Sequence, residues 1–219
     1  MPLPTFVPPA AARLADKATL SRTQAAAMLG IAPGTFDKLV RAHLIALPVR
    51  ASAVAELAAR PPLRVQSGAL TVLRTDAINA SDPHRYPGDD RPYIGFGTAM
   101  TDEEVAAASL RWWRSDPEIV VDNQLFAVAL ATIPVAVFEV TETLDCITRP
   151  DEASRGIRRY SYGGRLLARI HEGGLEPVVE RALPKDLRDR AAQIMASRIL
   201  NSDAAAGGPI AYLNPVPEA

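Results

Sequence analysis

The sequence predicts an α+β protein in which a small N-terminal three-helix unit precedes a larger mixed domain. Residues 13–60 alternate short helical patterns with brief turns, whereas apolar runs of strand length dominate after residue 93. Prolines 61 and 62 separate the two regions, because proline ends a helix. We therefore expect a flexible arm over residues 1–12, a helical domain over 13–62 and a mixed domain over 69–219.

The composition is ordinary for a folded protein, with 48% hydrophobic and 22% charged residues in 219. The single cysteine, Cys146, excludes an intrachain disulfide and a cysteine-based zinc cluster, and it fits a reducing cytoplasm. Residues 1–9 contain four prolines and no basic residue, so we expect no signal peptide. Because long uncharged apolar stretches are missing, we also expect no membrane association, and a cytoplasmic, nucleoid-associated location.

The near-neutral net charge of −1 conceals an uneven distribution along the chain. Residues 1–64 carry eight basic and three acidic side chains, a net charge of +5. The remaining residues carry 16 basic and 22 acidic side chains, a net charge of −6. This asymmetry favours contact between the first region alone and a polyanion, although so small an excess can also arise by chance.

Two consecutive helices are predicted between residues 20 and 44. Ser21 and Gln24 form a capping box that opens the first helix, and Gly30 ends it, since glycine takes positive φ at little cost. Pro33 suits the first turn of the second helix, where its missing N–H costs nothing. Alanines 25–27 allow the helices to approach closely. The residues expected to lock the pair are Leu29, Ile31, Phe36, Leu39 and Val40.

This segment resembles the excisionase/MerR-like winged helix-turn-helix. The matching positions are Leu20, Ser21, Gln24, Ala25, Ala26, Leu29, Gly30, Ile31, Thr35, Leu39 and Leu44. The resemblance covers residues 16–60 and implies a double-stranded DNA partner and a role as a transcriptional regulator or repressor. It also implies that the second helix enters the major groove and that a short hairpin, the wing, reaches the DNA backbone. A third helix over residues 52–60 would close the core with Val54 and Leu57.

Particular DNA contacts follow from the resemblance. Thr35, Lys38 and Arg41 would be the exposed residues of the recognition helix, Arg22 would contact phosphate from the first helix, and Arg50 would lie on the wing. Residues 32–34 offer no side-chain donor to base edges and Asp37 repels phosphate, so we expect few direct base contacts. Tight recognition of one DNA site would then require a homodimer or a second nucleic-acid contact.

The second domain is predicted to contain a bent antiparallel sheet or small barrel with two or more helices. Strands are expected at 93–97, 119–121, 125–133, 135–144 and 209–213, with a strand pair or bulged strand at 158–170. Helices are expected from the capping box at Thr101–Glu104 to about Trp113, and from Pro184 to Leu200. Residues 79–92 are rich in turn formers and predict a long exposed loop, and Pro134 predicts a turn or an edge.

Two arginine-rich segments are candidates for a second nucleic-acid surface. The candidate residues are Arg111, Trp113, Arg114, Arg158, Arg159 and Arg165. Indoles beside guanidinium groups can stack on bases and clamp phosphates. Equally, one tryptophan can be core while the arginines are solvated, and arginines on an edge strand can prevent sheet-to-sheet association. In pattern, this region resembles domains of actinobacterial and phage proteins, and more distantly PUA-like barrels, which bind modified bases or RNA.

Enzyme chemistry, cofactors and metals are not predicted. His43, His84 and His171 are far apart and at no metal-ligand spacing, and Cys146 follows an apolar strand as a small core residue. The sequence contains no phosphate-binding glycine motif. The competing hypothesis is that the helical unit binds a protein, as in an antitoxin-like or phage accessory factor; a hydrolase or transferase is a third.

Overall fold

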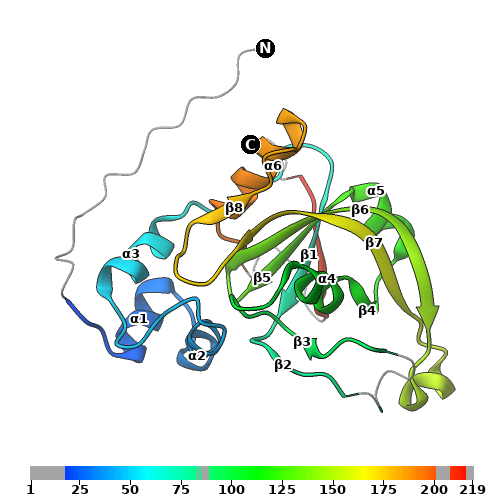
Figure 1. Ribbon diagram of the computed structural model, residues 1–219, viewed down its shortest axis with the longest axis horizontal. Coiled ribbons are helices and arrows are strands. Elements are labelled where there is room, and N and C mark those ends of the chain that lie inside the picture. Colours follow the sequence, from blue (N-terminus) through cyan, green and yellow to red (C-terminus); the bar gives the residue numbers. More distant parts are fainter. Residues whose placement is uncertain (1–17, 83, 85–88, 201–207, 216–219) are drawn as a thin grey trace.

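A computed structural model describes residues 18–82, 84, 89–200 and 208–215 (Figure 1). The predicted arm over residues 1–12 lies outside them. The chain is α+β: three short helices precede a mixed, curled half-barrel sheet with helices packed against it. In the described ranges, no helix is long and apolar enough to cross a membrane.

The first three helices are α1 (Arg22–Leu29), α2 (Pro33–Arg41) and α3 (Ala51–Ala59). The capping box of α1 is confirmed, since Ser21 Oγ accepts from Gln24 N at 3.2 Å and Gln24 Oε1 accepts from Ser21 N at 2.9 Å. Gly30 closes α1 with φ of 65°, and Pro33 occupies the first turn of α2, as predicted.

The helices enclose a small apolar core, and most of the predicted core residues are buried. Those with 1% exposure or less are Ala25, Ala26, Leu29, Phe36, Leu39, Val54 and Leu57. Ile31 and Val40 are only partly buried and pack against the edge of this core. Ala27 faces solvent, so two of the three alanines rather than all three allow the close approach.

The predicted wing is not found, and a single backbone bridge lies in its place. Within the described chain, no hairpin lies between α2 and α3; residues 42–49 form turns and bends. Arg50 instead forms an antiparallel bridge with Thr19, flanked by hydrogen bonds from Leu20 N to Val49 O (2.9 Å) and from Ala51 N to Ala18 O (2.8 Å). The segment contains no strand residues and brings the chain back beside the start of α1.

The main sheet has the order β4-β7-β6-β5-β1-β9, with β8 paired to β7. Its strands are β1 (Leu70–Thr75), β4 (Arg111–Trp113), β5 (Leu125–Leu130), β6 (Ile133–Ile147), β7 (Arg159–Ile170), β8 (Pro177–Val179) and β9 (Ile210–Leu213). β1 and β5 run parallel, whereas the other pairs are antiparallel. The sheet is therefore mixed, not antiparallel as predicted, because β1, a strand that was not predicted, runs parallel to β5.

Bulges curl the sheet. The ladder between β6 and β7 shifts register three times, and bulges increase the local bend and twist of a strand. The prediction of a bulged strand at 158–170 is confirmed in β7. Figure 1 shows these two long strands sweeping together past α4 and β4. β9 is the predicted strand at the opposite edge.

Several boundaries differ from the prediction. α4 (Asp102–Leu110) begins at the predicted capping box but ends three residues early, because Arg111 starts β4. Residues 119–121 were predicted as a strand but lie in α5 (Pro117–Asn123), whose first turn is capped by Asp116. Pro134 lies inside β6 instead of at a turn. α6 (Lys185–Met195) ends before the predicted Leu200.

The predicted loop at 79–92 is only partly exposed. It contains β2 (Asn79–Ala80), which pairs with β3 (Tyr93–Ile94), so the predicted strand at 93–97 is shorter than expected. Arg91 is 5% exposed, with its guanidinium 2.6 Å from the Asp89 carboxylate. Part of this loop, residue 83 and residues 85–88, lies outside the described chain.

The three helices are docked on the rest of the protein through arginine contacts. Arg198, which follows α6, donates to the carbonyl of Leu29 at the end of α1 and to Thr132 Oγ1. Arg60 donates to the carbonyls of Leu175 (2.9 Å) and Met195 (3.0 Å). These contacts, together with a continuous apolar core, fix the position of α2 relative to the sheet.

Candidate nucleic-acid interface

The first turn of α2 is open to solvent, as a groove-reading helix requires. Residues 32–34 are exposed, whereas Thr35 and Lys38, which were predicted to be exposed, are partly buried. Arg22 of α1 forms an ion pair with Asp37 of α2 at 3.0 Å, and the two side chains are 53% and 42% exposed. This pair is solvent-screened and weak, so Arg22 can exchange Asp37 for another anion.

The two cations of α2 converge on one carboxylate from outside the three-helix unit. Lys38 Nζ lies 2.8 Å from Asp76 Oδ2, and Arg41 Nη2 lies 3.0 Å from Asp76 Oδ1. Asp76 follows β1, so the contact joins α2 to the sheet. In this conformation, the predicted DNA-contacting charges are therefore partly neutralised by the same chain. Figure 1 shows α2 near the start of β2, which comes shortly after Asp76.

The environment of Asp76 favours its charged form. Partial burial raises the pKa of Asp76, but hydrogen bonds from Lys38 and from the backbone of Ala77, together with the charges of Lys38 and Arg41, outweigh burial and lower the pKa. The carboxylate is thus ionised at neutral pH and remains an anion opposite the two cations.

Arg50 is exposed and stands at the N-cap of α3. It lies beside Thr19 at the bridge described above, where the wing was expected. The predicted contacts Arg22, Lys38, Arg41 and Arg50 thus all belong to the surface of the three-helix unit. His43, just after α2, is also exposed.

The candidate second surface is divided into separate sites. Antiparallel pairing of β4 with the start of β7 brings Arg111, Trp113 and Arg159 near one another. Arg165 lies six residues further along β7, a separation of about 20 Å for an extended strand. Its guanidinium binds Glu139 on the neighbouring strand, with Nε 2.6 Å from Oε2. The six residues predicted for the second nucleic-acid surface therefore do not form one continuous surface.

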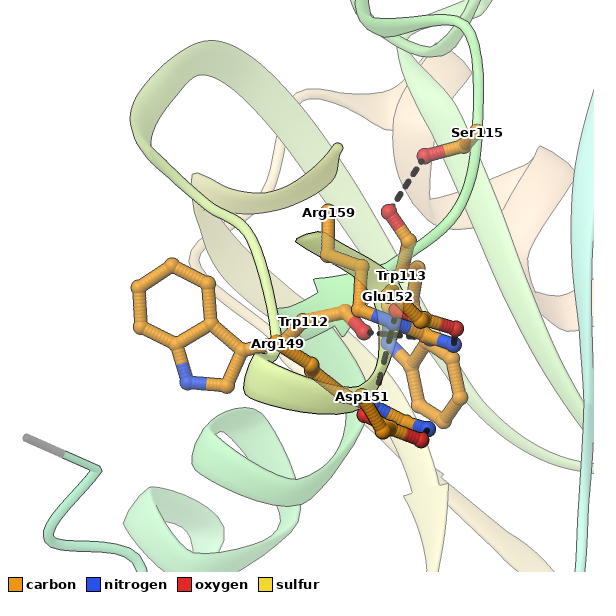
Figure 2. A network of polar contacts seen from close by, with 7 residues as sticks. All are labelled: Trp112, Trp113, Ser115, Arg149, Asp151, Glu152 and Arg159. Atoms are coloured by element: carbon orange, nitrogen blue, oxygen red, sulfur yellow. Dashed lines mark hydrogen bonds and ion pairs between the residues drawn. The ribbon is translucent and has the colours of Figure 1, made fainter. Parts of the chain in front are cut away.

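Two of the four candidate arginines at the β4 end, Arg111 and Arg159, form ion pairs. Figure 2 shows Arg159 together with Arg149. Arg159 binds Glu152 through Nε (2.6 Å) and Nη2 (2.7 Å), and Arg149 Nε lies 3.4 Å from the same carboxylate. The hydrogen bond from Arg159 lowers the pKa of Glu152, although burial acts in the opposite direction. Arg111 pairs with Asp90 at 2.8 Å. The Glu152 network is buried and belongs to the fold, whereas the Arg111–Asp90 pair is exposed and weak.

The two tryptophans of β4 are buried to different extents. Trp112 is 8% exposed, and Trp113 is half-buried with its indole N–H donating to Ser109 O at 2.6 Å. The structural alternative for this segment, a core tryptophan beside arginines, is therefore confirmed for Trp112. Arg114 and Arg158 are exposed and remain candidate contacts.

A shallow hollow of about 590 Å³ lies beside Arg114. Its lining residues are Arg114, Ser115, Asp116, Pro117, Glu118, Ile210 and Tyr212. Its polar groups already serve the fold: Asp116 caps α5, and Ser115 Oγ lies 2.6 Å from Tyr162 Oη. Burial raises the pKa of Tyr162 to about 12, so its hydroxyl stays neutral at physiological pH.

Two long-range polar contacts had no sequence signal. Asp76 follows an unpredicted strand, and Arg169 is 1% exposed on β7, where it binds Thr98 O and Asp102 Oδ1, both at 3.0 Å. Long-range contacts of this kind leave no local pattern. Cys146, predicted as core, is partly exposed on β6. Among the described residues, no group of three or more histidine, cysteine or acidic side chains could hold a metal.

Comparisons with known proteins give no further indication of function. No protein-family model, no curated protein and no solved structure matches this chain.

Proposed function

We propose that this chain is a DNA-binding protein of the regulator or repressor type. In this proposal α1 and α2 form a helix-turn-helix, α2 is the recognition helix, and α3 completes its core. The observation that carries the proposal is the arrangement around Gly30. Its φ of 65° turns the chain sharply between two short helices that share the buried residues Leu29, Phe36 and Leu39.

The distribution of charge supports the proposal. Arg22, Lys38, Arg41 and Arg50 are all at the surface of the three-helix unit, with no more than two acidic side chains, Asp37 and Glu56, between residues 18 and 64. Cations placed this way bind phosphates and orient the helix on a duplex. The exposed residues 32–34 at the start of α2 carry no base-reading group, so backbone contacts dominate the affinity of one copy.

Specific recognition then requires more than one three-helix unit. Two copies of this chain on half-sites one helical turn apart would supply it, as in other helix-turn-helix dimers. The exposed Arg114 and Arg158 are the remaining candidates for a second contact from the sheet.

The test is a titration of fluorescent duplex DNA of mixed sequence, long enough to hold two half-sites, at several salt concentrations. The double variant Lys38→Ala/Arg41→Ala removes two phosphate-binding cations. Its affinity should fall by about tenfold or more at low salt, and the slope of log K against log salt should become less steep by about 2.

A matched control is Lys185→Ala/Arg190→Ala on α6. These cations also form exposed ion pairs, with Asp189 at 2.5 Å and Asp186 at 3.1 Å, but they lie outside the three-helix unit. The control should bind DNA as the parent protein does. Equal binding by both double variants, or no DNA binding by the parent protein at low salt, would contradict the proposal and favour the protein-interaction alternative.

A further inference from the structure

Lys38, Arg41 and Asp76 together form a filled anion-binding site. The two cations approach different oxygens of one carboxylate, at 2.8 and 3.0 Å. A lysine ammonium and an arginine guanidinium converging on an oxyanion is also the arrangement by which proteins bind phosphate. The side-chain chemistry would be the same if the anion were a phosphate of the DNA backbone.

The carboxylate is held in place by its own backbone. Asp76 Oδ1 accepts from Ala77 N at 2.7 Å, and Asp76 O accepts from Phe96 N at 2.9 Å. Gly95 packs so closely here that a Cβ would lie 2.8 Å from Asp76 O and 2.5 Å from Ala77 O. The turn after β1 therefore presents the carboxylate in a fixed position.

The end of α2 is also held by the segment that follows β3. Thr98 N donates to Ala42 O, the residue that caps α2, at 3.1 Å. The contact thus consists of a backbone hydrogen bond beside two ion pairs. Asp76 and Arg41 nevertheless keep 54% and 60% of their side chains exposed, so the ion pairs are weak and a competing anion can reach the cations.

We propose that Asp76 is an intramolecular competitor of DNA, occupying the phosphate position on the recognition helix and lowering the affinity of the free protein. This inference rests on the proposed DNA binding and assigns its regulation to one residue. Binding of a duplex exchanges the carboxylate for a phosphate at Lys38 and Arg41. The carboxylate is then left to solvent, with only its Ala77 hydrogen bond.

The experiment compares the full chain with Asp76→Asn in the same duplex titration. Asparagine keeps an oxygen for the Ala77 N–H but removes the charge that pairs with the cations. We expect the variant to bind mixed-sequence duplex about two- to thirty-fold more tightly at low salt, which is the range that two exposed ion pairs supply. The gain should shrink as salt rises.

Two controls separate this mechanism from a general change in charge. Asp122→Asn removes one exposed negative charge from α5, which lies away from α2 in Figure 1, and should change the affinity less than about twofold. In the Lys38→Ala/Arg41→Ala background, Asp76→Asn should also have no more effect than Asp122→Asn, because its target cations are missing. Asp76→Ser, whose hydroxyl can also accept from Ala77 N–H, serves if the asparagine variant does not fold.

The outcomes are distinct. Tighter binding that depends on Lys38 and Arg41 supports the inference. Unchanged affinity of Asp76→Asn, with DNA binding by the parent protein, overturns the inference and leaves the proposed function standing. A gain that persists without the two cations also overturns it, because the effect would then be a general one of charge. If neither the parent nor the variant binds DNA at low salt, both proposals are wrong.

Discussion

Arg159 and Glu152 are joined by two parallel hydrogen bonds, from Nε and Nη2 to the two carboxylate oxygens, at 2.6 and 2.7 Å. Glu152 is only 5% exposed, and Arg149 also faces it. The network closes the end of the sheet where β7 begins, and Figure 2 shows it beside Trp112 and Trp113. Arg159 was a predicted nucleic-acid contact, but its guanidinium is used in this network within the fold.

Glu152→Gln should destabilise the protein at neutral pH by about 3 kcal/mol, because it leaves buried arginine without its counter-charge. The pKa of Glu152 is lowered in the folded protein, so the stabilisation is present above the ordinary glutamate value of about 4.3 and is lost as pH falls through the lower, folded value. Urea unfolding at a series of pH values should therefore show the parent and the variant converging in strong acid.

The control for this prediction is Glu172→Gln, an exposed glutamate in the turn after β7. It should change the free energy of unfolding by less than about 0.5 kcal/mol at every pH. A constant difference between the parent and Glu152→Gln down to pH values below the folded pKa would show that the glutamate charge is not what stabilises this end of the sheet.

Alanine substitutions at Gly164 and Gly34 should have opposite effects on stability. A Cβ at Gly164 would lie 2.2 Å from Glu139 O, whereas a Cβ at Gly34 would have no heavy atom within 4 Å. Gly164→Ala should therefore lower the free energy of unfolding by about 3 kcal/mol, since backbone atoms of β6 must move. Gly34→Ala should raise it by about 0.5–1 kcal/mol, because alanine loses less entropy in a helix.

Chemical denaturation of both glycine variants tests this difference in sign. If Gly164→Ala is as stable as the parent protein, Gly164 does not approach the backbone of Glu139 on β6 as closely as described. If Gly34→Ala is instead destabilised, the first turn of α2 does not have the open helical geometry described above.

The three-helix unit could be predicted because its signals are local. Ser21 with Gln24, Gly30 and Pro33 each act within one turn of helix, and each is found where the sequence placed it. The same logic would have identified α5, since Asp116 and Pro117 are a cap and a first-turn proline. The β-branched residues 119–121 instead suggested a strand, which shows that capping signals can outweigh a short apolar run.

The sheet and the contact of Asp76 with α2 depend on residues that are distant in the sequence. β1 pairs with β5 about fifty positions away, and its parallel direction leaves no turn signal in the sequence. Asp76 is 35 residues from Arg41, and an acidic residue after a strand is too common to predict a partner. The candidate contacts of α2 were therefore predictable as residues, but their pairing with Asp76 was not.

Arg198 supports the docking of the three-helix unit at a second point, the end of α1. Its guanidinium donates to Leu29 O, where α1 ends, and to Thr132 Oγ1 of the β5–β6 turn. Arg198→Ala should lower the free energy of unfolding by about 2 kcal/mol, because two partly buried acceptors lose their donor. The exposed Arg181→Ala is the control and should have little effect. Equal stability of the two variants in urea would mean that the apolar core alone, and not this arginine, fixes α1 to the sheet.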